Sequence, residues 1–116
     1  MNRIYGAAIP DLETQMRFRM VRQGALASNV ANADTPKYRR LDVTFEEALH
    51  QANGADPSAA HRVIRGPRGT RPDGNGVDRD QEVIGMVRNA GAFQDMASVL
   101  ARIYAMRRMA ATGQLS

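Results

Sequence analysis

Apolar residues recur at helical spacing in two long segments, one near each end of the chain. In the first segment most steps are of three or four residues, and the row consists of Ile9, Leu12, Met16, Met20, Gln23, Leu26, Ala27 and Val30, with Gln23 as its polar interruption. Pro10 suits a first helical position, because its missing N–H would have no helical partner there. Pro36 disfavours helix at the residue before it. The pattern predicts a helix within residues 1–34, with the residues before Pro10 either extending it through a kink or fraying.

The second segment carries a more regular pattern, in which steps of three and four alternate without exception. This heptad row consists of Val83, Met86, Ala90, Phe93, Ala97, Leu100 and Tyr104. A second row, displaced by one residue's rotation of roughly 100°, consists of Met96, Val99, Ile103 and Met106. Asp78 or Asp80 is the expected N-terminal cap. We predict that residues 78–116 form a helix whose heptad row packs on the first helix, and whose displaced row contacts a neighbouring subunit.

The residues between the two helices carry weaker signals. In the connector, residues 35–52, the alternation over Leu41–Phe45 is a short strand signal, and Thr44 with Glu47 resembles a capping box that would start a short helix over Phe45–Gln51. Residues 53–77 contain glycines and prolines throughout, and only Val63 and Ile64 could anchor them. We expect a flexible insert there, without regular structure.

These elements predict an all-α fold, built from an antiparallel pair of long N- and C-terminal helices with a coiled-coil-like seam. A short extended connector and a flexible central insert complete it. The expected divisions are residues 1–34, 35–52, 53–77 and 78–116. Such a hairpin has little core of its own, so we expect it to complete its burial in an assembly.

Composition and charge exclude several classes of function. The 116-residue chain has a formal net charge of +4 and one lysine, but its arginines form no continuous basic face, which argues against nucleic-acid binding. It contains no cysteine, and therefore neither disulfides nor thiolate metal ligands. His50 and His61 lack partners at metal-ligand spacing, and no serine lies in a nucleophile motif. We expect no catalytic, cofactor-binding or metal site, no membrane span, and no cleaved signal peptide within Met1–Pro10.

The segment Leu26–Arg39 resembles the N-terminal signature of flagellar rod and hook proteins. Its matching residues are Asn29, Asn32, Asp34, Thr35, Pro36 and Tyr38. The residues 41–45 and the run 75–82 ahead of the last helix look specifically like the proximal rod protein of this family. The sequence departs from the family at Lys37, where glycine is usual, and a positive φ at this position would be strained.

The resemblance implies an antiparallel helical hairpin that stacks in a helical tube around a central channel. Subunits of this family pass unfolded through the flagellar type III export apparatus and fold at the growing tip. The implied partners are other rod proteins, copies of the chain itself, the export gate, and the base or adaptor at the MS ring. The implied location is the rod, in the periplasmic space. Phe45 and Leu49 resemble the segment by which early export substrates engage the gate, although a buried anchor on a short helix would show the same spacing.

Two alternatives stay open at this point. The nearest is another rod protein of the same family, the C type, against which the Asp34–Thr35–Pro36 form argues. The other is a small basic helical nucleic-acid-binding protein, which would need the basic face that the arginines do not form.

Overall fold

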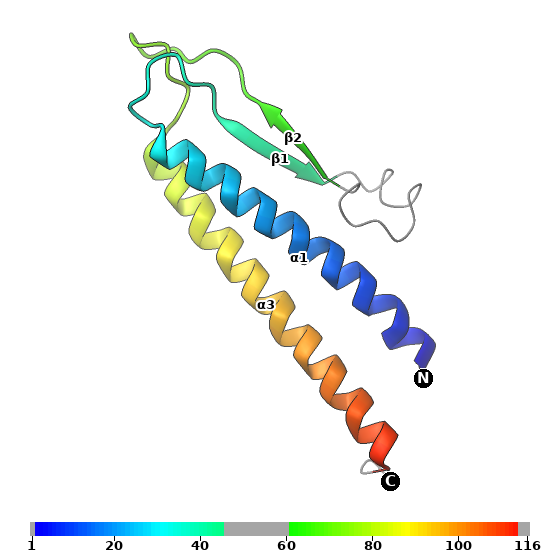
Figure 1. Ribbon diagram of the computed structural model, residues 1–116. Coiled ribbons are helices and arrows are strands. Elements are labelled where there is room, and N and C mark those ends of the chain that lie inside the picture. The colour runs from blue at the N-terminus through cyan, green and yellow to red at the C-terminus, as the bar shows by residue number, and fades with distance from the viewer. Residues whose placement is uncertain (1, 46–60, 114–116) are drawn as a thin grey trace.

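Two long helices lie side by side and antiparallel along the whole molecule (Figure 1). The computed structural model describes residues 2–45 and 61–113. Helix α1 spans Asn2–Ala31 and helix α3 spans Arg79–Thr112. The molecule measures 66 × 29 × 13 Å, so its shortest dimension is about one helix diameter. The predicted helical hairpin is confirmed.

The ends of the helices follow from local chemistry. The Asp78 carboxylate accepts hydrogen bonds from the backbone N–H groups of Asp80 and Gln81, at 3.1 and 3.3 Å, and thereby caps α3, so that Asp78 and not Asp80 is the cap among the two predicted alternatives. Gly113 ends α3 with a φ of 75°, the left-handed conformation that glycine adopts without strain. Pro10 lies inside α1 and not at its start, and the helix therefore extends through it, at the loss of one backbone hydrogen bond.

A small β-hairpin packs beside α1, and it corrects the prediction of an all-α fold. Strand β1 spans Leu41–Phe45, strand β2 spans His61–Arg65, and they pair antiparallel with Val43 opposite Val63. Residues 61–65 were expected to lack regular structure, but the glycines and prolines of the insert flank this stretch and leave it uninterrupted. Phe45 ends β1 and does not start a helix, and the rest of the predicted helix over Phe45–Gln51 lies outside the described residues.

The main apolar core lies between β1 and α1. Phe18, Ala25 and Val43 are buried there, with Val21, Leu41 and Phe45 packed around them. The rings of Phe18 and Phe45 meet edge to face, with centroids 5.6 Å apart. Because β1 supplies the side chains that reach α1, β2 is an outer strand, and Val63 and Ile64 are exposed.

The contact between α1 and α3 is displaced by one residue from the predicted heptad row. The buried residues of α3 are Glu82, Asn89 and Ile103, which repeat at intervals of seven or fourteen, and Gly85 lies against Leu26. Asn89 donates hydrogen bonds to the Arg19 carbonyl at 2.7 Å and the Gln23 side chain at 2.8 Å. Two of the buried positions are polar, so a hydrophobic pattern does not reveal this row.

The burial of individual residues therefore differs from both predicted rows. Val83 and Tyr104 of the heptad row are 44% and 47% exposed and Ala90 is also exposed, whereas Met86, Phe93, Ala97 and Leu100 are half-buried at the edge of the helix pair. Ile103, predicted to contact a neighbouring subunit, is only 8% exposed and belongs to the interior of this chain. Val99 and Met106 are exposed and Met96 is half-buried, and their subunit contacts stay predictions.

Adjacent residues of α3 should therefore respond differently to a charge. Ile103→Asp places an unpaired carboxylate in a buried position and should lower the free energy of unfolding by more than about 2 kcal/mol. Tyr104→Asp, at the next and exposed position, should cost less than about 1 kcal/mol. Urea denaturation of the two purified variants, followed by helical circular dichroism, measures both values. Equal losses would contradict the helix register described above.

Candidate functional site: the polar junction

Buried polar side chains gather where the end of α1 and the start of α3 meet two loops, the one between α1 and β1 and the one between β2 and α3. We call this cluster the polar junction, and its members are Asn29, Asn32, Tyr38, Arg40, Asn75 and Glu82. Asn29, Asn75 and Glu82 are buried, and the other three are half-buried. Because buried polar groups are stable only when hydrogen-bonded, their mutual geometry determines how these segments fit together.

Asn29 is completely buried and makes all the hydrogen bonds that its amide allows. Its Oδ1 accepts from the Leu41 backbone N–H at 2.7 Å and from the Tyr38 hydroxyl at 3.1 Å. Its Nδ2 donates to the Leu41 carbonyl at 2.8 Å and to Glu82 Oε2 at 3.2 Å. The amide thus takes the place of a neighbouring strand at the start of β1 and connects it to both helices.

The Glu82 carboxylate lies between the two helices with a donor on each oxygen. Asn29 donates to Oε2, and Arg40 Nε donates to Oε1 at 2.7 Å. The hydrogen bond to Glu82 raises the pKa of the Arg40 guanidinium, while burial acts in the opposite direction. Arg40 also lies 3.6 Å from Asp42. The buried charge of Glu82 is therefore paired, as its position requires.

Asn75 satisfies the carbonyl groups that remain free after α1 ends. Its Nδ2 donates to the carbonyls of Asn32 and Thr35, at 2.9 and 2.7 Å, and its Oδ1 accepts from the Val77 N–H at 2.7 Å. Asn32 in turn donates to the Ser28 carbonyl at 2.9 Å. The last carbonyls of a helix need such donors, and here a loop far along the chain supplies them.

Tight turns allow the two loops to approach each other closely. Lys37 has a φ of 63°, and its N–H donates to the Asp73 carbonyl at 2.8 Å. The positive φ considered from the sequence is thus present, on a residue for which it is strained. Gly74, with a φ of 77°, lies against Lys37. A Cβ atom on Gly69 would lie 2.0 Å from the Asn75 carbonyl oxygen, so this position has room only for glycine.

The structure brings most of the signature residues together. Asn29, Asn32 and Tyr38 belong to the polar junction, and Thr35 donates to Asn32 Oδ1 at 3.1 Å. Asp34 forms an ion pair with Arg79 at 2.8 Å, although both side chains are exposed, and Pro36 is exposed at the turn. Phe45 lies apart in β1 against Phe18, and Leu49 falls outside the described residues.

Sequence reasoning missed Arg40, Asn75 and Glu82 as members of this site. The carbonyl groups at the end of a helix need donors, so the sequence implied that some donor must be present there. Nothing near α1 in the sequence showed that Asn75 is this donor. Glu82 carries the sequence signal of an exposed first-turn acid, which is its usual place. Only the pairing of the helices buries it.

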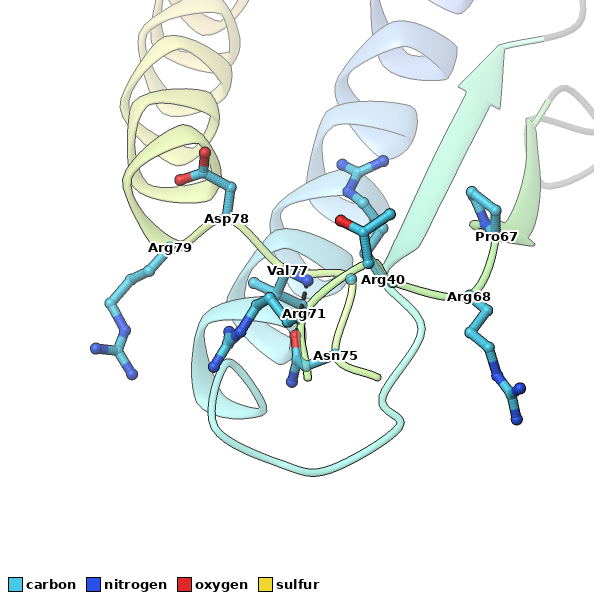
Figure 2. Close-up of a pocket in the computed structure, with 11 residues that line it drawn as sticks. Arg40, Pro67, Arg68, Arg71, Asn75, Val77, Asp78 and Arg79 are labelled. Atoms are coloured by element: carbon cyan, nitrogen blue, oxygen red, sulfur yellow. Dashed lines mark hydrogen bonds between the residues drawn. The ribbon is translucent and has the colours of Figure 1, made fainter. Parts of the chain in front are cut away.

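A shallow cavity of about 580 Å³ borders the junction, and Figure 2 shows its lining. Three of its four arginines make structural contacts: Arg40 is held by Glu82, Arg71 donates to the Ala33 carbonyl at 2.9 Å, and Arg79 pairs with Asp34. Arg68 and Arg79 point away from the cavity in Figure 2. In residues 2–45 and 61–113 no three metal-ligating side chains gather, and neither helix is apolar and long enough to cross a membrane. The polar junction is therefore a set of hydrogen bonds and ion pairs that hold α1, the loops and α3 together.

Two substitutions near the end of α1 should distinguish the stabilising effect of the polar junction from that of a surface ion pair. Asn29→Ala leaves both backbone groups of Leu41 and one oxygen of Glu82 without partners, and should lower the free energy of unfolding by about 2–4 kcal/mol. Asp34→Ala removes an exposed ion pair and should cost less than about 1 kcal/mol. Denaturant unfolding of the two variants checks the contrast. A smaller loss for Asn29→Ala than for Asp34→Ala would show that the junction does not stabilise the hairpin.

Comparison with known proteins places this architecture in a family. No family model matches the chain. It is 33% identical over 93 residues to the flagellar basal body rod protein FlgB of Aeromonas hydrophila, covering 66% of this chain and 70% of that protein. It is 29% identical over 117 aligned positions to FlgB of Escherichia coli K12, covering 81% and 85%. It is 24% identical over 106 residues to FlgB of Bacillus subtilis 168, covering 78% and 82%. The helical hairpin, the signature residues of its polar junction and these relatives agree: the chain belongs to the FlgB family of flagellar basal body rod proteins.

Proposed function

We propose that this rod subunit has no enzymatic activity, passes unfolded through the flagellar type III export apparatus, and polymerises into a helical tube. The tube joins the export gate and the MS-ring base to the distal rod, in the periplasmic space. Its neighbours are copies of itself and other rod proteins. The role as a structural subunit of the flagellar rod comes from the family, and the export route, partners and location are the proposal.

One observation carries the proposal of polymerisation: α3 exposes large apolar side chains over residues 83–87 and again over residues 99–109. They are Val83, Ile84, Val87, Val99, Tyr104, Met106 and Met109. A helix of a monomeric protein is normally polar on the faces that no other element covers. Exposed apolar surface on this scale is typical of a contact with another protein.

The thin hairpin also suits export in an unfolded state. Its apolar core is small, it has no disulfide to break, and α3 contains Gly85 and Gly91, which each weaken a helix by about 1 kcal/mol relative to alanine. Assembly with neighbours would supply the burial that the single chain lacks. The polar junction then fixes the register of the hairpin once the chain has emerged.

Isolated basal bodies test the proposed role. Cells lacking the gene should not swim, and the tagged chain should restore swimming and appear in purified basal bodies at the base of the rod. In cells blocked in rod completion, the tagged chain should accumulate outside the cytoplasm, and inactivation of the export apparatus should abolish this. A tagged chain that restores swimming but stays in the cytoplasm would overturn the proposal.

Phe45 and Leu49 are the proposed export-gate segment, as the family resemblance implies. Phe45→Ala should reduce the secreted fraction of the subunit severalfold, because the gate recognises the segment before folding. Phe18→Ala is a matched control, because it removes the other half of the same ring contact without touching the segment. Secreted and cytoplasmic amounts of both variants are compared by immunoblot. Equal secretion of the two variants would mean that Phe45 acts only in the fold.

A further inference from the structure

An apolar groove runs between α1 and α3 on the side of the hairpin away from the β-strands. Arg19, Met20 and Gln23 line it from α1, and Ala90, Phe93 and Ala97 line it from α3, around a volume of about 420 Å³. Phe18 faces β1, and Met20, two residues later, points roughly 200° away around the helix. Met20 is 64% exposed. The groove is therefore open to solvent in this chain.

Ala90, Phe93 and Ala97 on the α3 wall of the groove belong to the heptad row, which continues along α3 in both directions beyond the groove. From Val83 to Tyr104 this row contains no charged residue, and its members are exposed or half-buried. A 3,4 repeat of apolar residues over 22 positions, about 33 Å, matches the side-chain spacing of another helix. An extended or irregular segment would not keep that spacing over such a length. The groove and the heptad row that extends it therefore suit another helix.

The floor of the groove has one polar group that lacks a partner. Arg19 contacts Asn89 at 3.4 Å through Nη1, and its guanidinium lies over the Phe18 ring. Its Nε is buried and has no hydrogen-bond acceptor within the described residues. A buried donor of this kind favours an occupant that brings an acceptor, above all a carboxylate.

The opposite flank of α3 carries exposed apolar side chains and an exposed carboxylate. We call it the ridge, and it consists of Ile84, Asp95, Val99 and Met106, with Arg88 and Arg102 between them. Val99 lies two residues after Ala97 of the groove, and hence roughly 200° around the same helix. The apolar members are exposed, and Asp95 is exposed without an ion pair among the described side chains. The ridge spans residues 84–106, which matches the length of the heptad row.

We propose that the ridge of one copy of this chain packs into the groove of the next copy, with Asp95 directed at Arg19. This inference rests on the proposed polymerisation and names its surfaces. The two surfaces are different and lie on opposite sides of α3, so the contact is heterologous and repeats from copy to copy without closing into a two-fold dimer. In parallel copies Asp95 lies about 9 Å along the helix from the level of Arg19, because Arg19 contacts Asn89, six residues before Asp95. A small axial shift between copies and the length of the arginine side chain together would close this distance.

Cysteine cross-linking tests the contact directly, because the chain has no cysteine of its own. Cells express two differently tagged variants, Ala97→Cys in the groove and Val99→Cys on the ridge. After mild oxidation and isolation of basal bodies, we expect a disulfide between the two tags. The matched pair Ser98→Cys with Val99→Cys places the first cysteine on the outer face of α3, and should give severalfold less product.

Three results would overturn the ridge-in-groove contact. They are Ala97→Cys chains that link mainly to each other, equal cross-linking of the matched pair, and basal bodies that contain both variants without a cross-link. The first would indicate a two-fold contact, and the last a different occupant of the groove. Absence of the tagged wild-type chain from basal bodies is a separate result, because it would overturn the proposed function as well.

A charge exchange tests the contact between Arg19 and Asp95. Asp95→Arg should reduce the diameter of swimming zones in soft agar severalfold, because it places two arginines together. Combining it with Arg19→Glu should restore a large part of the lost swimming. If the double variant swims no better than Asp95→Arg alone, while both are secreted at wild-type levels, Arg19 does not meet Asp95.

Discussion

The buried carboxylate of Glu82 is the constraint around which the loop end of the molecule is arranged. A charge between two helices is stable only when its oxygens have donors, and Arg40 and Asn29 supply one each. Arg40 precedes β1 and Asn29 lies in α1, so the same carboxylate connects α3 with both. Asn29 in turn holds the backbone of Leu41 at the start of β1. The same hydrogen bonds therefore set both the register between the two helices and the position of the β-hairpin.

Polar and apolar side chains of α3 occupy different faces of the helical hairpin. Polar side chains at positions 82 and 89 occupy the contact between the helices, where a coiled coil would carry apolar residues. Apolar side chains that could have filled that seam instead line the edge of the helix pair and its outer surface. This distribution specifies the fold of the single chain by hydrogen bonds and leaves hydrophobic surface available for neighbours. It suits a protein whose relatives are rod components.

The thin shape of the molecule also leaves apolar surface for contacts with neighbouring subunits. A hairpin 13 Å thick cannot enclose a large core, and its main apolar cluster is confined to Phe18, Ala25, Val43 and their surroundings. The open ends of the helices lie at the opposite end of the molecule from the loops (Figure 1), and Ile103 is the buried apolar residue of α3. Contacts with other subunits would therefore add burial towards the termini, beyond the main apolar cluster.

The sequence by itself determined the two long helices, an aspartate cap at residue 78 or 80, the turn after α1 and the membership of the signature residues in one region, because each depends on neighbours within a few positions. It also carried the strand signal of Leu41–Phe45. The pairing of this strand with residues 61–65 depended on contacts across many intervening residues, which local pattern does not encode. The helix register depended on Glu82 and Asn89, polar residues that only their distant partners make suitable for burial. Tertiary structure therefore decided which apolar row faces inward and which stays free, since a buried polar group is stable only where the rest of the fold brings its partners.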